Sequence, residues 1–168
     1  RHSAKDRAEN VMIVDLMRND LGRVSRPGTV AVTGLLDVQP HPGVWHLVST
    51  VTATLRDDVS DAGLLAASFP PGSVTGAPKI AATAVIADLE PAPRGVYTGA
   101  IGLASPAWGL ELNVAIRTFE VTDAGLELGV GGGITADSVP MIEWRECLDK
   151  AAPFLAAVGP GLTPWLRT

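Results

Sequence analysis

Two glutamates, Glu143 and Glu146, lie three residues apart in the segment "IEWRECLDK". On a helix they project from the same side, where carboxylate oxygens can hold a hard cation such as Mg²⁺. Lys150 follows Glu146 by four residues, which is also the spacing of a surface ion pair worth about 0.3–0.5 kcal/mol. The spacing alone favours the surface pair and leaves the cation site open.

Glycines occur in two loops that precede expected helices, the run Gly131, Gly132, Gly133 and the segment "PGSVTGAPK". Free backbone N–H groups at such places suit an anion such as a carboxylate, and tight turns are the alternative that the spacing favours. The run fails the dinucleotide fingerprint, because Ile134 stands at its last glycine position. The second loop contains Lys79 but lacks the Walker spacing, so neither loop predicts a nucleotide site.

Three isolated side chains could also do chemistry. Arg117, on an expected strand, could bind a carboxylate with two hydrogen bonds, or be an edge-strand surface arginine. His46 could be an acid or base, or a half-buried structural histidine. Tyr97 could donate a hydrogen bond to a substrate, or pack on its strand. Cys147 lies in the middle of an expected helix, and we interpret it as a structural residue.

Helices and strands that position these residues follow from hydrophobic periodicity and from Gly and Pro. In the first half we expect a helix over about 5–21 that is closed by Gly22, then strands over 29–38 and 44–55 around the turn "QPHPG". A short helix capped by Ser60 should follow and end at 68. After an irregular stretch, a further helix should run from Pro78 to about 90. The helices and strands of this half carry His46 and Lys79.

In the second half a β-hairpin is expected over 95–105 and 110–121, followed by a strand over 126–134. A last helix should begin near Ser138 or Pro140, and Pro153 should kink or interrupt it. Since tight turns join consecutive strands, the sheets should be antiparallel and the fold class α+β.

Composition narrows the class of protein. The chain has 168 residues, is 46% hydrophobic and carries a formal net charge of −5, which is typical of a soluble globular protein and argues against a nucleic-acid partner. No apolar run is long enough to span a membrane, and a single cysteine suits the reducing cytoplasm. The first residue is Arg1, and "RHSAKDRAEN" is typical of the middle of a longer protein.

Six segments, taken in order, resemble the chorismate-binding enzymes: "KDRAENVMIVDLMRNDLGRV", "HLVSTVTATL", "FPPGSVTGAPKIAA", "GVYTGAIGLAS", "NVAIRTFEV" and "GGGITADSVPMIEWRECLDKA". The resemblance covers nearly the whole chain. It implies an α+β sandwich of antiparallel sheets and helices, of which residues 1–168 would form the C-terminal portion of a single catalytic domain. The N-terminal portion would lie upstream of Arg1, so we expect the fragment alone to be inactive.

Within this family the chain is most similar to aminodeoxychorismate synthase component I, because "AENVMIVDLMRND" has Asn10 where anthranilate synthases more often have histidine. The resemblance implies Mg²⁺-dependent amination of chorismate to 4-amino-4-deoxychorismate, on the para-aminobenzoate and folate pathway. A glutamine amidotransferase subunit or fused domain would supply the ammonia. The alternatives are an anthranilate synthase component I, which forms anthranilate and pyruvate, and a non-catalytic remnant that only binds.

The resemblance also implies a role for each candidate residue. The metal ligands for Mg²⁺ would be Glu9, Glu143 and Glu146, with the ion holding the ring carboxylate of chorismate. Tyr97 and Arg117 would bind the enolpyruvyl carboxylate, and His46 would lie near the ring chemistry. The remaining substrate contacts would come from backbone amides and loop residues, namely Gly131, Gly132, Gly133, Thr75, Gly76 and Lys79.

Overall fold

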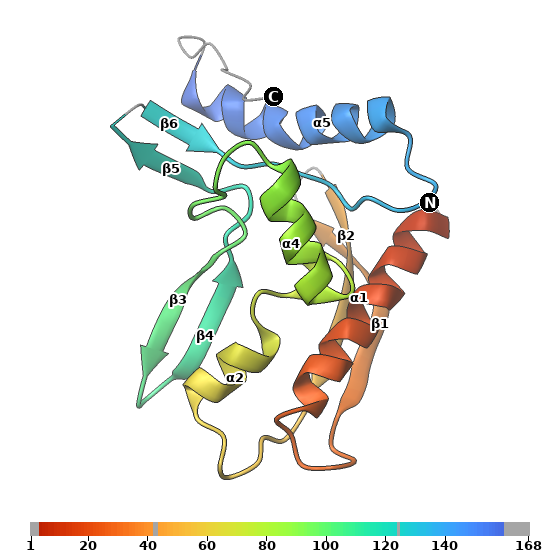
Figure 1. Ribbon diagram of the computed structural model, residues 1–168, viewed down its shortest axis with the longest axis vertical. Helices are drawn as coiled ribbons and strands as arrows, with labels where there is room; N and C mark the ends of the chain where they lie inside the picture. Colours follow the sequence, from red (N-terminus) through yellow and green to blue (C-terminus); the bar gives the residue numbers. More distant parts are fainter. Residues whose placement is uncertain (1–3, 42–43, 124, 160–168) are drawn as a thin grey trace. The chain divides into compact units, whose positions relative to one another are not determined.

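Helices and antiparallel hairpins alternate along the chain in a computed structural model that describes residues 4–41, 44–123 and 125–159 (Figure 1). The elements are α1 (Ala4–Gly22), β1 (Ala31–His41), β2 (Val44–Thr52), α2 (Asp61–Ser68), α3 (Gly72–Thr75), α4 (Lys79–Leu89), β3 (Ala100–Ser105), β4 (Gly109–Val114), β5 (Phe119–Thr122), β6 (Gly125–Leu128) and α5 (Pro140–Val158). The predicted α+β class with antiparallel pairing is confirmed. Part of the predicted turn at 39–43 lies outside the described residues.

The chain divides into two compact units, residues 1–83 and residues 84–168. In the first unit α1 packs on the β1–β2 hairpin and on α2 and α3. Val14, Val24 and Ala67 are buried there, as the apolar residues of a small core. Gly72 is needed for this packing, because a Cβ at its position would lie 2.5 Å from the Leu16 side chain of α1.

The short helix α2 begins as its sequence predicts. The Ser60 side chain accepts a hydrogen bond from the Gly63 N–H at 3.2 Å, which satisfies one of the free amides of the first turn. The next stretch was expected to be irregular, but residues 72–75 form one helical turn, α3, in which the Gly76 N–H donates to the Gly72 carbonyl at 2.9 Å. Cis peptide bonds precede Pro70 and Pro78 on either side of this turn.

A β-bulge interrupts the pairing of β1 with β2. Gly34 pairs with Thr50 and Asp37 pairs with Val48, so two residues of β1 lie opposite Ser49 alone. One of the two, Leu36, has a φ of 58°, in the left-handed region that a leucine seldom adopts. Gly34 borders the bulge, but the position with the left-handed φ is a leucine.

In the second unit two hairpins, β3–β4 and β5–β6, precede α5 (Figure 1). The predicted hairpin at 95–121 is confirmed in part, since β3 pairs with β4 from Ala100↔Val114 to Ser105↔Gly109. The predicted second strand, 110–121, is wrong at 115–118. The chain bends at 115–118, where Arg117 has a φ of 51°, and β5 starts at Phe119.

The last helix, α5, begins at Pro140, one of the two predicted starts, and continues to Val158. Pro140 suits the first turn because its missing N–H has no helical partner there. Of the two effects predicted for Pro153, an interruption of the helix is wrong, since Pro153 lies inside α5, and a kink there stays a prediction. None of the described helices is both long enough and apolar enough to cross a membrane.

Candidate functional site

Three charged groups converge on the glycine loop in the second unit. A Cβ placed on Gly132 would lie 3.5 Å from Glu143 Oε2, 3.7 Å from Glu146 Oε1 and 3.9 Å from Lys150 Nζ. Because Gly132 has no side chain, the space between the loop backbone and α5 stays open to these groups. The structure therefore brings together two predicted metal ligands, Glu143 and Glu146, with one of the predicted anion-binding glycines.

Glu143 is only 5% exposed, and its carboxylate is hydrogen-bonded within the second unit. The Ser138 hydroxyl donates to Glu143 Oε1 at 2.7 Å, and the Thr135 N–H donates to Ser138 Oγ at 3.0 Å. A buried carboxylate requires such partners, because its desolvation is costly. The sequence marked Ser138 only as a possible helix start, so its contact with Glu143 was not predicted.

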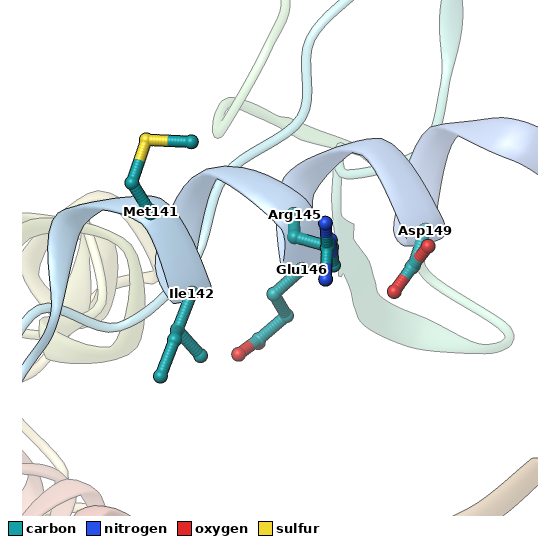
Figure 2. Close-up of a pocket in the computed structure, with 5 residues that line it drawn as sticks. All are labelled: Met141, Ile142, Arg145, Glu146 and Asp149. Carbon is teal, nitrogen blue, oxygen red and sulfur yellow. The ribbon is translucent and has the colours of Figure 1, made fainter.

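Glu146 forms the predicted ion pair with Lys150, with Nζ and Oε1 2.6 Å apart. The pair is more than a surface feature, because Lys150 Nζ also donates to the Gly131 carbonyl at 3.2 Å and so joins α5 to the loop. Glu146 lines an open hollow of about 390 Å³ along α5. Figure 2 shows Ile142, Glu146 and Asp149 extending from the same side of the helix, with Met141 on the other.

Tyr97 lies over the same loop from the segment that precedes β3. A Cβ on Gly131 would lie 2.6 Å from the Tyr97 hydroxyl oxygen, and a Cβ on Gly129 would overlap the ring. The Arg94 guanidinium lies 5.8 Å from the ring centroid, a cation–π distance, and binds Glu90 at 2.6 Å. That hydrogen bond lowers the pKa of Glu90.

Tyr97 is expected to stay protonated well into alkaline solution. Burial of the ring raises the pKa of its hydroxyl above the usual 10.0. The stability that this shift contributes is present below the unfolded-state pKa and is lost as pH rises through the folded pKa. Since Tyr97 is the single tyrosine of the chain, absorbance at 295 nm should show one ionisation with a midpoint above that value. A midpoint at or below 10.0 would contradict this, and Tyr97→Phe is the blank.

Arg117 lies in the bend after β4, exposed, beside the buried Ala115, which is 2% exposed. The predicted place on a strand is wrong for Arg117, because the left-handed φ breaks the strand there. Its guanidinium forms no hydrogen bond or ion pair with any described residue, so its role toward a carboxylate stays a prediction.

In the first unit Glu9 lies on α1 and His46 on β2, both half-buried. Asn10 joins these elements, since its Nδ2 donates to the Leu47 carbonyl at 3.2 Å. The predicted loop residues lie around α3. Thr75 ends α3 and donates from its hydroxyl to the Pro71 carbonyl at 3.2 Å, and Gly76 follows with a φ of 115°.

Lys79 begins α4 and binds an acidic side chain of α1. Its ammonium lies 2.8 Å from Asp20 Oδ2, and Asp20 is only 4% exposed. The same ammonium donates to the Pro70 carbonyl at 3.3 Å and the Ala67 carbonyl at 3.5 Å. Sequence spacing gave no sign of this pair, whose members are 59 residues apart.

The donor set of the second unit fits Mg²⁺. Two carboxylates point at one place on the loop, where a glycine leaves room, and oxygen donors are what this cation takes. Among the described residues no group of three or more His, Cys, Asp or Glu side chains that could hold a metal ion occurs. Glu9, the third predicted ligand, belongs to the other unit, so its part in a metal site stays a prediction.

Gly132→Ala tests the open space between loop and helix. The new methyl would lie in ordinary contact with the two carboxylates, and Gly132 has no left-handed φ, so the fold should be kept. We expect Mg²⁺ affinity, measured by isothermal titration, to fall on the order of 10-fold, as when groups around a metal are disturbed. Gly22→Ala, with open space around the added methyl, is the control. Unchanged Mg²⁺ affinity in Gly132→Ala would show that the space is not used.

Proteins with similar sequences are named as aminodeoxychorismate synthases and anthranilate synthases. Aminodeoxychorismate synthase component 1 of Salmonella typhimurium is 50% identical over 149 residues, which is 89% of this chain and 33% of that protein. Anthranilate synthase component 1 of Geobacillus stearothermophilus is 43% identical over 157 residues, 94% of this chain and 31% of that protein. The chain thus spans about a third of the length of these relatives.

Solved structures and a family model agree with these relatives. The crystal structure of anthranilate synthase component I from Streptococcus pneumoniae matches with a TM-score of 0.83 and 40% identity, over 89% of this chain and 34% of that chain. A family model described as chorismate binding enzyme matches residues 1–156. With nearly all of its length matched, the chain belongs to the chorismate-binding enzyme family.

Proposed function

We propose that the protein aminates chorismate to 4-amino-4-deoxychorismate with Mg²⁺ as cofactor. The observation that carries the proposal is the convergence of Glu143 and Glu146 on the Gly132 backbone, in a chain of the chorismate-binding family. The choice of product rests on identity, 48–50% to three aminodeoxychorismate synthase component 1 proteins and 43–46% to three anthranilate synthase component 1 proteins.

Each residue has a part in holding the dicarboxylate. Glu143 and Glu146, with Glu9, would hold Mg²⁺, whose contribution when bound is to offset the charge of the ring carboxylate. The Tyr97 hydroxyl and Arg117 would donate to the enolpyruvyl carboxylate. The amides of the glycine loop would donate to carboxylate oxygens, as backbone N–H groups before a helix do for anions.

His46 would serve as the general acid at the ring. In the amination, a C–N bond to ammonia forms, and the ring C–O bond breaks. A proton from His46 would let the hydroxyl leave as water, the bonded ammonia would lose one proton in return, and the enolpyruvyl ether would remain intact. We further propose that a glutamine amidotransferase subunit or domain supplies the ammonia, since the relatives are named as component 1.

An assay of the complete gene product with chorismate, Mg²⁺ and ammonium salt tests the proposal. Mass spectrometry should find 4-amino-4-deoxychorismate, and a lactate dehydrogenase coupled assay should find no pyruvate. Formation of anthranilate with equimolar pyruvate would instead establish the second candidate, which the match to the Streptococcus pneumoniae structure favours. Chorismate that binds in isothermal titration but is never consumed would leave only a binding protein.

A further inference from the structure

Two hydrogen bonds join α1 to the β1–β2 hairpin through the side chain of Asn10, and a third continues within the hairpin. Asn10 Nδ2 donates to the Leu47 carbonyl at 3.2 Å, and the Ser49 hydroxyl donates to Asn10 Oδ1 at 2.6 Å. Ser49 Oγ in turn accepts from the Leu36 N–H at 3.0 Å. These bonds connect the helix, the middle of β2 and the bulge of β1, and all three are partly buried.

The orientation of the Asn10 amide is determined by this chain of bonds. The Leu47 carbonyl can only accept, so Asn10 must present its nitrogen to it. The Asn10 oxygen then faces Ser49, whose hydroxyl donates to it while accepting from the Leu36 N–H. Both ends of the carboxamide are needed, which an aspartate cannot supply because it has no donor when ionised.

The bonded groups are next to two candidate site residues. Asn10 follows Glu9 on α1, and Leu47 follows His46 on β2. The bond from Asn10 to the Leu47 carbonyl thus links the two backbones one residue away from each candidate. Ser49 also satisfies the amide of Leu36, whose left-handed φ of 58° marks the bulge opposite. Helix, strand and bulge are thus connected by two side chains, Asn10 and Ser49.

We propose that Asn10 is a positioning residue, whose carboxamide fixes Glu9 on α1 relative to His46 on β2. This inference rests on the proposed function, since it matters only if Glu9 and His46 act on chorismate. A displacement of a reacting group by about 1 Å can lower a rate on the order of 100-fold, so a hydrogen bond that fixes two such groups has a large effect.

Kinetics of the complete gene product with chorismate, ammonium salt and Mg²⁺ test the proposal. Asn10→Asp, which keeps the shape but faces the Leu47 carbonyl with an oxygen, should lower kcat on the order of 10- to 100-fold, with KM for chorismate changed less than about threefold. Ser49→Ala should act in the same direction, and Ser49→Thr, which keeps the hydroxyl, should restore kcat. Hydrogen exchange at the Leu36 amide should be faster in Ser49→Ala than in Ser49→Thr, independent of activity.

Two exposed neighbours serve as matched controls, Asn19→Ala on α1 and Thr50→Ala on β2, and both should leave kcat unchanged. If Asn10→Asp and Ser49→Ala stay within about twofold of wild type while Glu9→Gln and His46→Ala are inactive, the positioning role is wrong and the proposed function stands. The positioning role is equally wrong if Ser49→Thr is as slow as Ser49→Ala. If the wild-type protein does not consume chorismate, the proposed function is wrong, and the positioning role that rests on it is wrong as well.

Discussion

Glu146→Gln is expected to reduce Mg²⁺-dependent turnover of chorismate by the complete gene product by about 100- to 1,000-fold. A Lewis-acid cation contributes several kcal/mol to a reaction, and each 1.4 kcal/mol is about tenfold in rate. Gln keeps the size of Glu146 but loses the charge that faces Gly132 and Lys150. Steady-state rates over a Mg²⁺ titration measure the effect, and isothermal titration without chorismate should show weaker Mg²⁺ binding.

Asp149→Asn is the matched control for this variant. Asp149 is exposed and extends from the same side of α5 into the same hollow (Figure 2), whereas the groups nearest to Gly132 are Glu143, Glu146 and Lys150. Loss of the Asp149 charge should change turnover less than about twofold. Full turnover by Glu146→Gln at the wild-type Mg²⁺ concentration would contradict the metal assignment and leave Glu146 as the partner of Lys150 alone.

Local patterns predicted the elements whose signals lie within a few residues. The cap at Ser60 and the start of α5 at Pro140 need only their own turn, and both are confirmed. The ion pair of Glu146 with Lys150 is confirmed for the same reason, since the i,i+4 spacing sets it.

Positive φ angles at residues with side chains were not predictable. Leu36 and Arg117 adopt φ of 58° and 51°, where glycine or asparagine would be expected, so the residue types at these two positions do not indicate the backbone conformation. For Leu36, the hydrogen bond that its N–H donates to Ser49 Oγ on the paired strand β2 supports the conformation. Pro153 lies inside α5, so the sequence rule for proline did not decide between a kink and an interruption.

The candidate site was predictable as residue types, but its geometry was not. Spacing favoured the interpretation of Gly132 as part of a turn and of Glu143 as a solvated carboxylate. Instead Glu143 is 5% exposed and faces the loop, held by Ser138. Contacts between the glycine loop and α5 depend on the backbone path of the segment that joins them, and hydrophobic periodicity does not predict that path.

Lys79→Met is expected to lower the free energy of unfolding of the 168-residue chain by about 3 kcal/mol. The change leaves the carboxylate of Asp20, whose side chain is 6% exposed, without the ammonium that lies 2.8 Å away. This expected loss of stability is at the lower end of the range for breaking a buried ion pair, because the Lys79 side chain keeps 20% of its surface exposed. Urea denaturation followed by tryptophan fluorescence measures it, provided that unfolding is two-state.

A double-mutant cycle separates this ion pair from simple packing. Asp20→Asn with Lys79→Met removes both charges, so the double variant should be more stable than Lys79→Met alone. The pair of Arg18 with Asp15 on the same helix is the control, since its side chains are 51% and 77% exposed and Asp15→Asn should cost less than about 0.5 kcal/mol. If Lys79→Met cost no more than Asp15→Asn, the carboxylate of Asp20 would not depend on Lys79, and the lysine would be available for the predicted substrate contact.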